Sequence, residues 1–238
     1  MSTAARNHVK AASDLVHRTI HACEIAKRAA SSAAEGIATS SRPSLNQIRE
    51  YEKELDDLDR EIDAGVTSAI TQVSGEDARE LLACMKITIG VERIGDLLLS
   101  FANSATAVGH RIEPQDIRDL TQMASLLEKM LSDVAEAFSA RDFRAAIKVL
   151  RADAEMDRLR NLIFLRHIEN PENVPRQESL QIIFMTQALE RAGDHAKNIA
   201  EELCYLVSGR TVRHVLMTYD KSFEQMLGEW LRQRDQKQ

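Results

Sequence analysis

The chain has 238 residues and a formal net charge of −6 at pH 7, with only 9 glycines, 4 prolines and 4% aromatic residues. This composition favours long helices over sheets, and the acidic balance gives no reason to expect nucleic acid, whose binders carry a basic face. No apolar run approaches the ~20 residues of a membrane-spanning helix and no signal peptide opens the chain, so we expect a cytoplasmic protein. The three cysteines, Cys23, Cys84 and Cys204, lie in helical patterns and are expected to be buried, reduced thiols.

The first half of the chain predicts three long helices. The first covers residues 4–40 and is rich in alanine and serine, so it should pack closely against its neighbours. The run Ser40-Ser41-Arg42-Pro43 ends it, and Ser44 is the expected cap of a second helix over about 44–74. A third helix is predicted over about 77–108.

The second half repeats this plan. Helices are predicted over about 115–139 and 142–169, and a sixth helix follows Pro175 and stops at Ser208-Gly209. Residues 211–235 carry a further amphipathic pattern. That segment predicts a seventh helix, which docks on the rest of the chain or on a partner.

Two similar segments support an internal duplication. ERIGD begins at Glu92, and ERAGD begins at Glu190, 98 residues later. A repeat of this size indicates two copies of one structural unit. We therefore predict an all-α fold of two tandem three-helix bundles, in residues 1–110 and 111–210, with an amphipathic tail in residues 211–238.

Acid pairs spaced four residues apart recur on two neighbouring helices in each half. If those helices pack side by side, four carboxylates converge, and they repel one another unless some protonate or a cation joins them. An all-oxygen set suits Mg, Mn, Ca or iron rather than structural zinc. The alternative is a solvated acidic face. The candidate ligands are Glu52, Asp56, Glu92 and Asp96 in the first half, and Asp153, Asp157, Glu190 and Asp194 in the second, with Asn198 one turn further.

Other chemical motifs are weak or missing. The Glu-x-x-His pattern of di-iron bundles does not occur at the E-R-x-G-D segments, and the sequence has no glycine-rich phosphate loop, nucleophile elbow or CxxC. We therefore expect no enzymatic activity. Arg93 and Arg191 are predicted to pair with acids on neighbouring helices, and His195 is predicted to lie at the surface or at an interface.

Several motifs together resemble the PhoU family. They are the paired E-R-[IA]-G-D segments, the run ERAGDHAKNIAEEL, the preceding EKELD and DAEMD, and GRTVRH after the sixth helix. GEDARELL also resembles the family's D-x-R segment, through Asp77 and Arg79. The resemblance covers roughly residues 10–214, which includes both repeats.

This resemblance implies a six-helix protein whose acidic motifs hold multinuclear metal clusters on the surface of each bundle. The eight acids, with Asn198, would be the ligands, and iron is the expected metal, with Mn, Mg, Ca or Zn as alternatives. PhoU-like proteins are not enzymes. They act in the cytoplasm, usually as homodimers, and associate with the membrane only indirectly. They couple the ATPase subunit of the phosphate ABC transporter to a sensor histidine kinase, which gives negative regulation of the starvation response when phosphate is abundant.

One departure from the family pattern distinguishes the two halves. Ser100 occupies the position in the first half that corresponds to Asn198 in the second. Because serine is a poorer metal ligand, we predict that the second-half site holds metal first. Two alternative functions remain: a metal-binding or storage protein without a signalling partner, and an accessory subunit of another anion transporter.

Overall fold

The computed structural model of the chain describes residues 3–73, 75–169 and 176–209. These ranges contain no strand, which confirms the all-α prediction; the predicted seventh helix over 211–235 lies outside them. The elements are α1 (Thr3–Thr39), α2 (Arg42–Ala69), a short 3₁₀ turn η1 (Ile70–Gln72), α3 (Gly75–Val108), α4 (Pro114–Ala140), α5 (Phe143–Glu169) and α6 (Arg176–Ser208).

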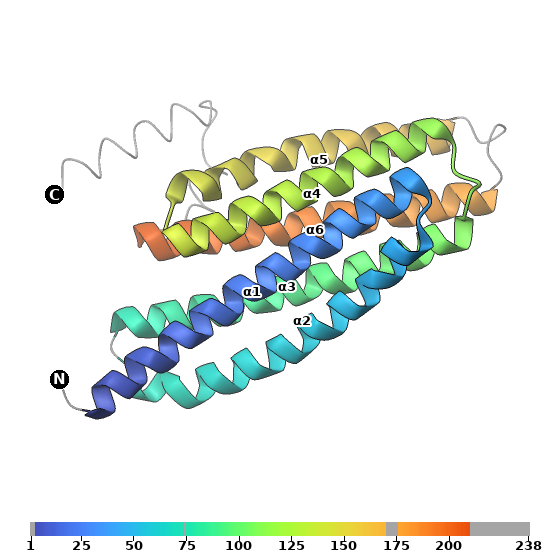
Figure 1. The fold of residues 1–238 in the computed structure, drawn as a ribbon. Coiled ribbons are helices and arrows are strands. Elements are labelled where there is room, and N and C mark those ends of the chain that lie inside the picture. The colour runs from blue at the N-terminus through green and yellow to red at the C-terminus, as the bar shows by residue number, and fades with distance from the viewer. Residues whose placement is uncertain (1–2, 74, 170–175, 210–238) are drawn as a thin grey trace, which may run out of the picture.

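The six helices form two bundles of three, as predicted (Figure 1). In this view α1–α3 make the lower bundle and α4–α6 the upper one, and consecutive helices run antiparallel. The bundles join where α3 packs along α6 and α1 packs along α4. Because α2 also packs on α3 and α5 on α6, the helices follow one another in the order α2, α3, α6, α5 across one side of the molecule.

The turn between α1 and α2 shows how the local sequence sets a helix boundary. Ser40 has φ 54°, a left-handed conformation that ends α1. Ser41 is then the cap of α2, because the backbone N–H of Ser44 donates to its hydroxyl at 3.3 Å. The prediction of Ser44 as the cap was therefore wrong. Pro43 lies in the first turn of α2, where a missing N–H costs no helical hydrogen bond.

Small side chains place α1 at the centre of the fold. This helix packs on α2, α3 and α4, which confirms the prediction of close packing. A Cβ atom at Gly36 would overlap Leu45 Cδ2 at 2.5 Å and lie 3.5 Å from the Leu45 backbone nitrogen, so the two helices approach closely there. The small residues that α1 buries are Ala22, Cys23, Ala26, Ala29, Ala30 and Ala33.

The three cysteines are buried, as predicted. Burial raises the pKa of the Cys23 thiol to about 12, of Cys84 to about 11 and of Cys204 to about 12. Thiols that stay protonated at neutral pH are poor nucleophiles and poor metal ligands. In the part of the chain that the structure describes, no helix is long and apolar enough to cross a membrane.

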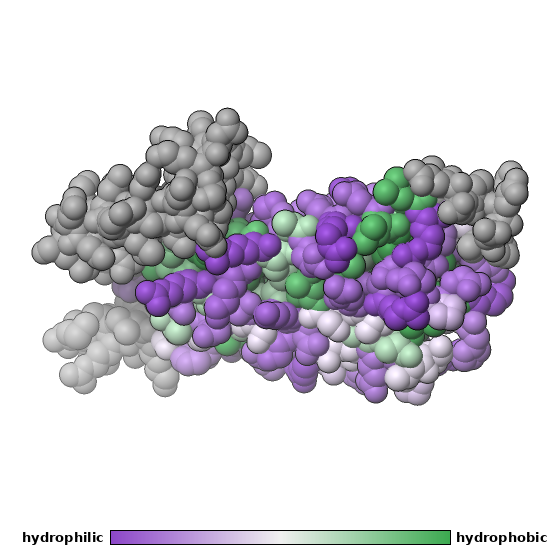
Figure 2. Space-filling view, turned by 90° about the horizontal axis from the view of Figure 1, so that it is seen from above, coloured by the Kyte–Doolittle hydropathy of each residue, from purple (hydrophilic) through white to green (hydrophobic). Residues whose placement is uncertain are grey.

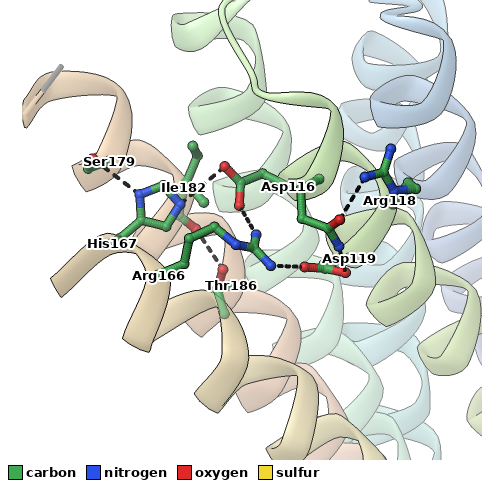
Figure 3. A network of polar contacts seen from close by, with 9 residues as sticks. Asp116, Arg118, Asp119, Arg166, His167, Ser179, Ile182 and Thr186 are labelled. Carbon is green, nitrogen blue, oxygen red and sulfur yellow. Dashed lines mark hydrogen bonds and ion pairs between the residues drawn. The ribbon is translucent and has the colours of Figure 1, made fainter. Parts of the chain in front are cut away.

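A buried polar network joins α4, α5 and α6 near the start of α4 (Figure 3). Arg166 donates to Asp116 and to Asp119, and His167 Nε2 lies 3.2 Å from Asp116 Oδ2. Burial disfavours the charged form of Asp116, but the contacts with His167 and Arg166 outweigh it and lower the pKa of this carboxyl. On the other side of the ring, His167 Nδ1 lies 3.2 Å from the Ser179 hydroxyl of α6. The network therefore ties three helices together around the buried carboxylate of Asp116.

Candidate functional site: two carboxylate clusters

The glycine of each E-R-x-G-D segment brings two helices together at the level of the acids. A Cβ atom at Gly95 would lie 2.8 Å from Leu55 Cδ1 and 3.9 Å from Glu52 Cα, so α3 approaches α2 closely at this point. A Cβ atom at Gly193 would lie 3.2 Å from Met156 Cγ, at the matching place between α6 and α5. Sequence reasoning did not assign this role to the glycines, although their repetition within the motif was the available signal.

The first cluster consists of Glu52 and Asp56 on α2 with Glu92 and Asp96 on α3. Partial burial raises the pKa of the Glu52 carboxyl, and the charges of Asp56 and Asp96 raise it further. Burial also raises the pKa of Glu92, with Asp96 as the next contribution. These acids therefore lie along the seam between α2 and α3 and act on one another through their charges.

Asp59 joins the first cluster, and the sequence prediction omitted it. Partial burial raises the pKa of this carboxyl, and the charges of Asp63 and Asp56 add to the effect. Asp59 follows Asp56 by three residues on α2, so the two lie on the same side of the helix. That spacing was the signal that could have identified it.

The second cluster consists of Asp153 and Asp157 on α5 with Glu190 and Asp194 on α6. Burial raises the pKa of Glu190, and the charge of Asp194 is the next contribution. Burial raises the pKa of Asp194 as well, followed by the charge of Asp153. Asn198 is exposed on α6, one turn beyond Asp194. The acids of the second half therefore act on one another along the seam between α5 and α6, as those of the first half do between α2 and α3.

Cationic side chains cross the second seam and partly neutralise its acids. Arg160 of α5 lies 3.4 Å from Glu190 Oε1 on α6 and 3.6 Å from Asp157 Oδ1 on its own helix. Lys197 of α6 donates to Asp153 of α5. Each of the two cations therefore links α5 to α6 through a carboxylate.

The first seam has a different arrangement of charge. Arg93 Nε lies 3.4 Å from Glu92 Oε2, and Arg93 Nη1 lies 3.2 Å from Asp96 Oδ2, both on α3 itself. The close ion pairs of Arg93 are therefore on its own helix and not on a neighbouring one as predicted, although its charge also counteracts the rise in the pKa of Asp59 on α2. Arg191 is exposed and His195 is half-buried on α6. Ser100 Oγ donates to the Asp96 carbonyl at 3.0 Å, so this hydroxyl is turned toward its own backbone.

These clusters fit a hard cation in their chemistry, but their side chains do not form a ligand group as they stand. All the charged donors are carboxylates, and the pKa values of Glu52 and Glu190 are raised first by burial and then by the charges of neighbouring acids. Within the described ranges, no three His, Cys, Asp or Glu side chains are grouped closely enough to hold a metal ion. Metal binding therefore stays a prediction, and it requires the carboxylates to turn away from Arg93, Arg160 and Lys197.

Comparisons with known sequences identify the family. Residues 19–105 and 120–203 match the PhoU domain. The chain is 31% identical over 221 residues to a phosphate-specific transport system accessory protein PhoU homolog of Pseudomonas aeruginosa, covering 90% of this chain and 86% of that protein. It is 30% identical to the homolog of the same description from Caulobacter vibrioides, over 82% of this chain and 89% of that protein.

Solved structures show the same fold. The crystal structure of PhoU from Pseudomonas aeruginosa has a TM-score of 0.77 at 25% identity, covering 84% of this chain and 99% of that one. The phosphate transport system regulatory protein PhoU from Streptococcus pneumoniae has a TM-score of 0.79 at 20% identity, covering 86% of this chain and 99% of that one. Matches to both halves of the sequence and to the whole six-helix arrangement lead to one conclusion: this chain belongs to the PhoU family.

Proposed function

We propose that this protein is a cytoplasmic accessory regulator of phosphate uptake that carries metal on its two carboxylate clusters. The observation that supports this most directly is the duplication of the clusters. Each lies on a seam where a glycine brings two helices together, and each contains carboxylates whose pKa is raised by burial and by one another. Retaining mutual repulsion at two equivalent places costs stability, and a bound cation would remove that cost.

In this proposal, metal shapes a docking surface and takes no part in a reaction. The first cluster would hold it through Glu52, Asp56, Glu92 and Asp96, with Asp59 beside them. The second would use Asp153, Asp157, Glu190 and Asp194, with Asn198 at its edge. The bound ion would supply positive charge that screens the carboxylates and fixes α2 to α3 and α5 to α6. Iron is the first candidate.

The names of the relatives, which are accessory proteins of a phosphate-specific transport system, support an association with such a transporter. We infer that the chain binds the ATPase subunit of a phosphate ABC transporter and a sensor histidine kinase, as a homodimer. It would hold the kinase inactive while phosphate is abundant. This makes it a negative regulator of the starvation response, attached to the membrane only through its partners.

The experiment replaces one acid pair and follows both binding and signalling. Glu190→Ala with Asp194→Ala should leave a folded helical protein, because the buried apolar residues of α6 lie mostly on its other face. Phosphate-replete cells that carry this variant should express a phosphate-starvation reporter. A pull-down with the variant should recover less transporter ATPase than one with the wild type. Normal repression and normal recovery of the ATPase would contradict the proposed site.

A matched control comes from α2. Glu50 and Glu54 are also spaced four residues apart, but both are exposed, and they pair with Lys53 and His21 at 3.4 Å. Glu50→Ala with Glu54→Ala should repress normally. If this control also switches the reporter on, general loss of negative charge would explain the result and the clusters would not be the functional surface.

A further inference from the structure

Three exposed apolar side chains form a strip along the seam between α3 and α6. Leu82 and Ile89 are 42% and 48% exposed on α3, two turns apart, and Tyr205 is 37% exposed on α6. Single exposed apolar residues are ordinary on a protein surface. These three differ because they lie on the same pair of packed helices, with Leu82 and Tyr205 near one end of it.

The contacts between α3 and α6 fix this placement. Lys86 Nζ lies 2.9 Å from Glu202 Oε1, and a Cβ atom at Gly90 would lie 2.8 Å from Ile199 Cγ1. The residue numbers therefore rise along α3 as they fall along α6. This register sets Leu82 at the level of Leu206, close to Tyr205, and the ion pair of Lys86 with Glu202 lies between Leu82 and Ile89.

The chain leaves α6 at the end of this strip. The backbone N–H of Gly209 donates to the Tyr205 carbonyl at 2.8 Å, and Gly209 has φ +69°, a conformation that reverses chain direction after a helix. At the same end, Leu206 lines a cavity of about 280 Å³ together with Arg79 and Glu80 of α3. Whatever follows Gly209 therefore begins next to the strip.

The sequence that follows has its own apolar stripe. Residues 210–238 lie outside the described residues, but their pattern alternates spacings of three and four that are typical of one face of a helix. As a helix, residues 215–231 would be about 25 Å long. The apolar positions are Val215, Leu216, Tyr219, Phe223, Met226, Leu227, Trp230 and Leu231.

We propose that residues 215–231 dock on the strip formed by Leu82, Ile89 and Tyr205. A short tether gives a segment a high effective concentration at surfaces within its reach, and the tether begins at Gly209, which is hydrogen-bonded to Tyr205. Docking covers an apolar face of the tail and an apolar face of the body at once. This interaction goes beyond the proposed metal sites and does not depend on them.

A second exposed apolar area provides the competing site. It lies beside the break between α5 and α6, where Figure 2 shows apolar side chains gathered near one end of the molecule. Along α6, Phe184 is roughly 36 Å from Ser208 at 1.5 Å per residue, so this area is remote from the tether. Its exposed residues are Leu162, Leu165, Leu180 and Phe184.

The chain's single tryptophan, Trp230, lies in the tail and reports on docking in the full-length protein. In the wild type its fluorescence should be blue-shifted and protected from iodide quenching. Leu82→Glu with Ile89→Glu should shift the emission to that of water-exposed tryptophan and remove the protection. Leu162→Glu with Leu165→Glu is the matched control and should leave both unchanged. All four leucine and isoleucine positions are exposed, so circular dichroism should show folded protein in every case.

Each other outcome overturns the proposal. Exposed Trp230 in the wild type means that the tail does not dock. A shift only in the Leu162 and Leu165 variant places the tail on the α5–α6 area. A blue shift that disappears on dilution means that the tail binds another molecule. Binding of a hydrophobic dye is a second measurement, and a chain truncated after Gly209 should bind more dye than the full-length chain. Leu82→Glu with Ile89→Glu, introduced into the truncated chain, should abolish this increase. Equal dye binding by the truncated and full-length chains would contradict the docking.

Discussion

Asp116 and Glu190 are both largely shielded from water in the second bundle, yet the pKa of Asp116 is lowered and the pKa of Glu190 is raised. The Asp116 side chain is 1% exposed, and its contacts with His167 and Arg166 lower the pKa of its carboxyl despite the burial. The Glu190 side chain is 17% exposed, and burial together with Asp194 raises its pKa although Arg160 lies nearby. The surroundings of Asp116 therefore favour its ionised form, whereas the surroundings of Glu190 disfavour its ionised form.

The difference teaches where to look for function. A buried charge with complete partners is explained by the structure that surrounds it. Repulsion among the carboxylates of each cluster lowers stability, so stability does not explain why both halves of the chain contain such a cluster. Carboxylates with perturbed pKa values are candidates for binding sites. The same contrast holds for the first bundle, where Glu52 behaves like Glu190.

The largest expected effect comes from breaking the buried network. Asp116→Asn leaves Arg166 and His167 without their shared buried anion. Removing one partner of a buried ion pair destabilises by about 3–5 kcal/mol, and urea unfolding followed by circular dichroism measures it. A loss below about 1 kcal/mol, the range of surface pairs, would show that this network is no more than a surface-like contact.

Low pH should remove the difference in stability between the wild type and Asp116→Asn. Because the pKa of Asp116 is lower in the folded chain than in the unfolded one, its stabilisation is complete above the ordinary carboxyl pKa and is lost as pH falls through the folded value. The stability gap between the wild type and Asp116→Asn should therefore narrow only below about pH 4. Unfolding curves from pH 7 to pH 3 test this. A gap that already closes between pH 7 and pH 5 would contradict a lowered pKa for the Asp116 carboxyl.

Widening the first seam should have an intermediate effect. In Gly95→Val the new side chain overlaps Leu55 and pushes α3 from α2, whereas Gly75 has nothing within 4 Å and Gly75→Val serves as the control. Overpacking of this kind costs about 1–3 kcal/mol. Comparison of the two unfolding free energies measures it, and equal values for the two variants would mean that the seam is not tightly packed.

Neutralising one seam carboxylate should stabilise the protein slightly. Glu52→Gln removes repulsion with Asp56 and Asp96 and should raise the unfolding free energy by up to ~0.5 kcal/mol, a small value because the site is partly open to solvent. Glu50→Gln, on the exposed face of the same helix, should give no gain, because Glu50 pairs with Lys53. If Glu52→Gln lowered the unfolding free energy, the charge of Glu52 would stabilise the fold as that of Asp116 does, and the proposed difference between the two carboxylates would be wrong.

Periodic patterns predicted most of the fold, because each long helix repeats its apolar residues over many turns. On α6, for example, the apolar residues recur every three or four positions, and those buried include Met185, Leu189, Ala192, Ala196, Ile199 and Leu203. Boundaries were less predictable, because Ser41 and Ser44 are both good caps and only the left-handed Ser40 decides between them.

The sequence predicted the acids of the candidate site but not the cations that surround them. A spacing of four residues on a helix fixes which carboxylates share a face, so Glu190 and Asp194 could be assigned together. Cations such as Lys197 reach across from another helix, and nothing in local spacing predicts their partners. The network of Asp116, Arg166 and His167 joins residues about 50 positions apart with no repeated pattern, so only the packing of α4 on α5 and α6 reveals it.

Metal titration tests the central claim, that the seam carboxylates hold a cation. Chelator-treated wild type would be titrated by calorimetry with Mn²⁺, and with Fe²⁺ under anaerobic conditions. The same titration would use Glu190→Ala with Asp194→Ala, Glu52→Ala with Asp56→Ala, and the control Glu50→Ala with Glu54→Ala. We predict saturation at a few ions per chain for the wild type and the control, a lower capacity in each cluster variant, and the greater loss in the Glu190 and Asp194 variant. No saturable binding by the wild type, or equal binding by all four proteins, would contradict the claim and leave both clusters as solvated acidic faces.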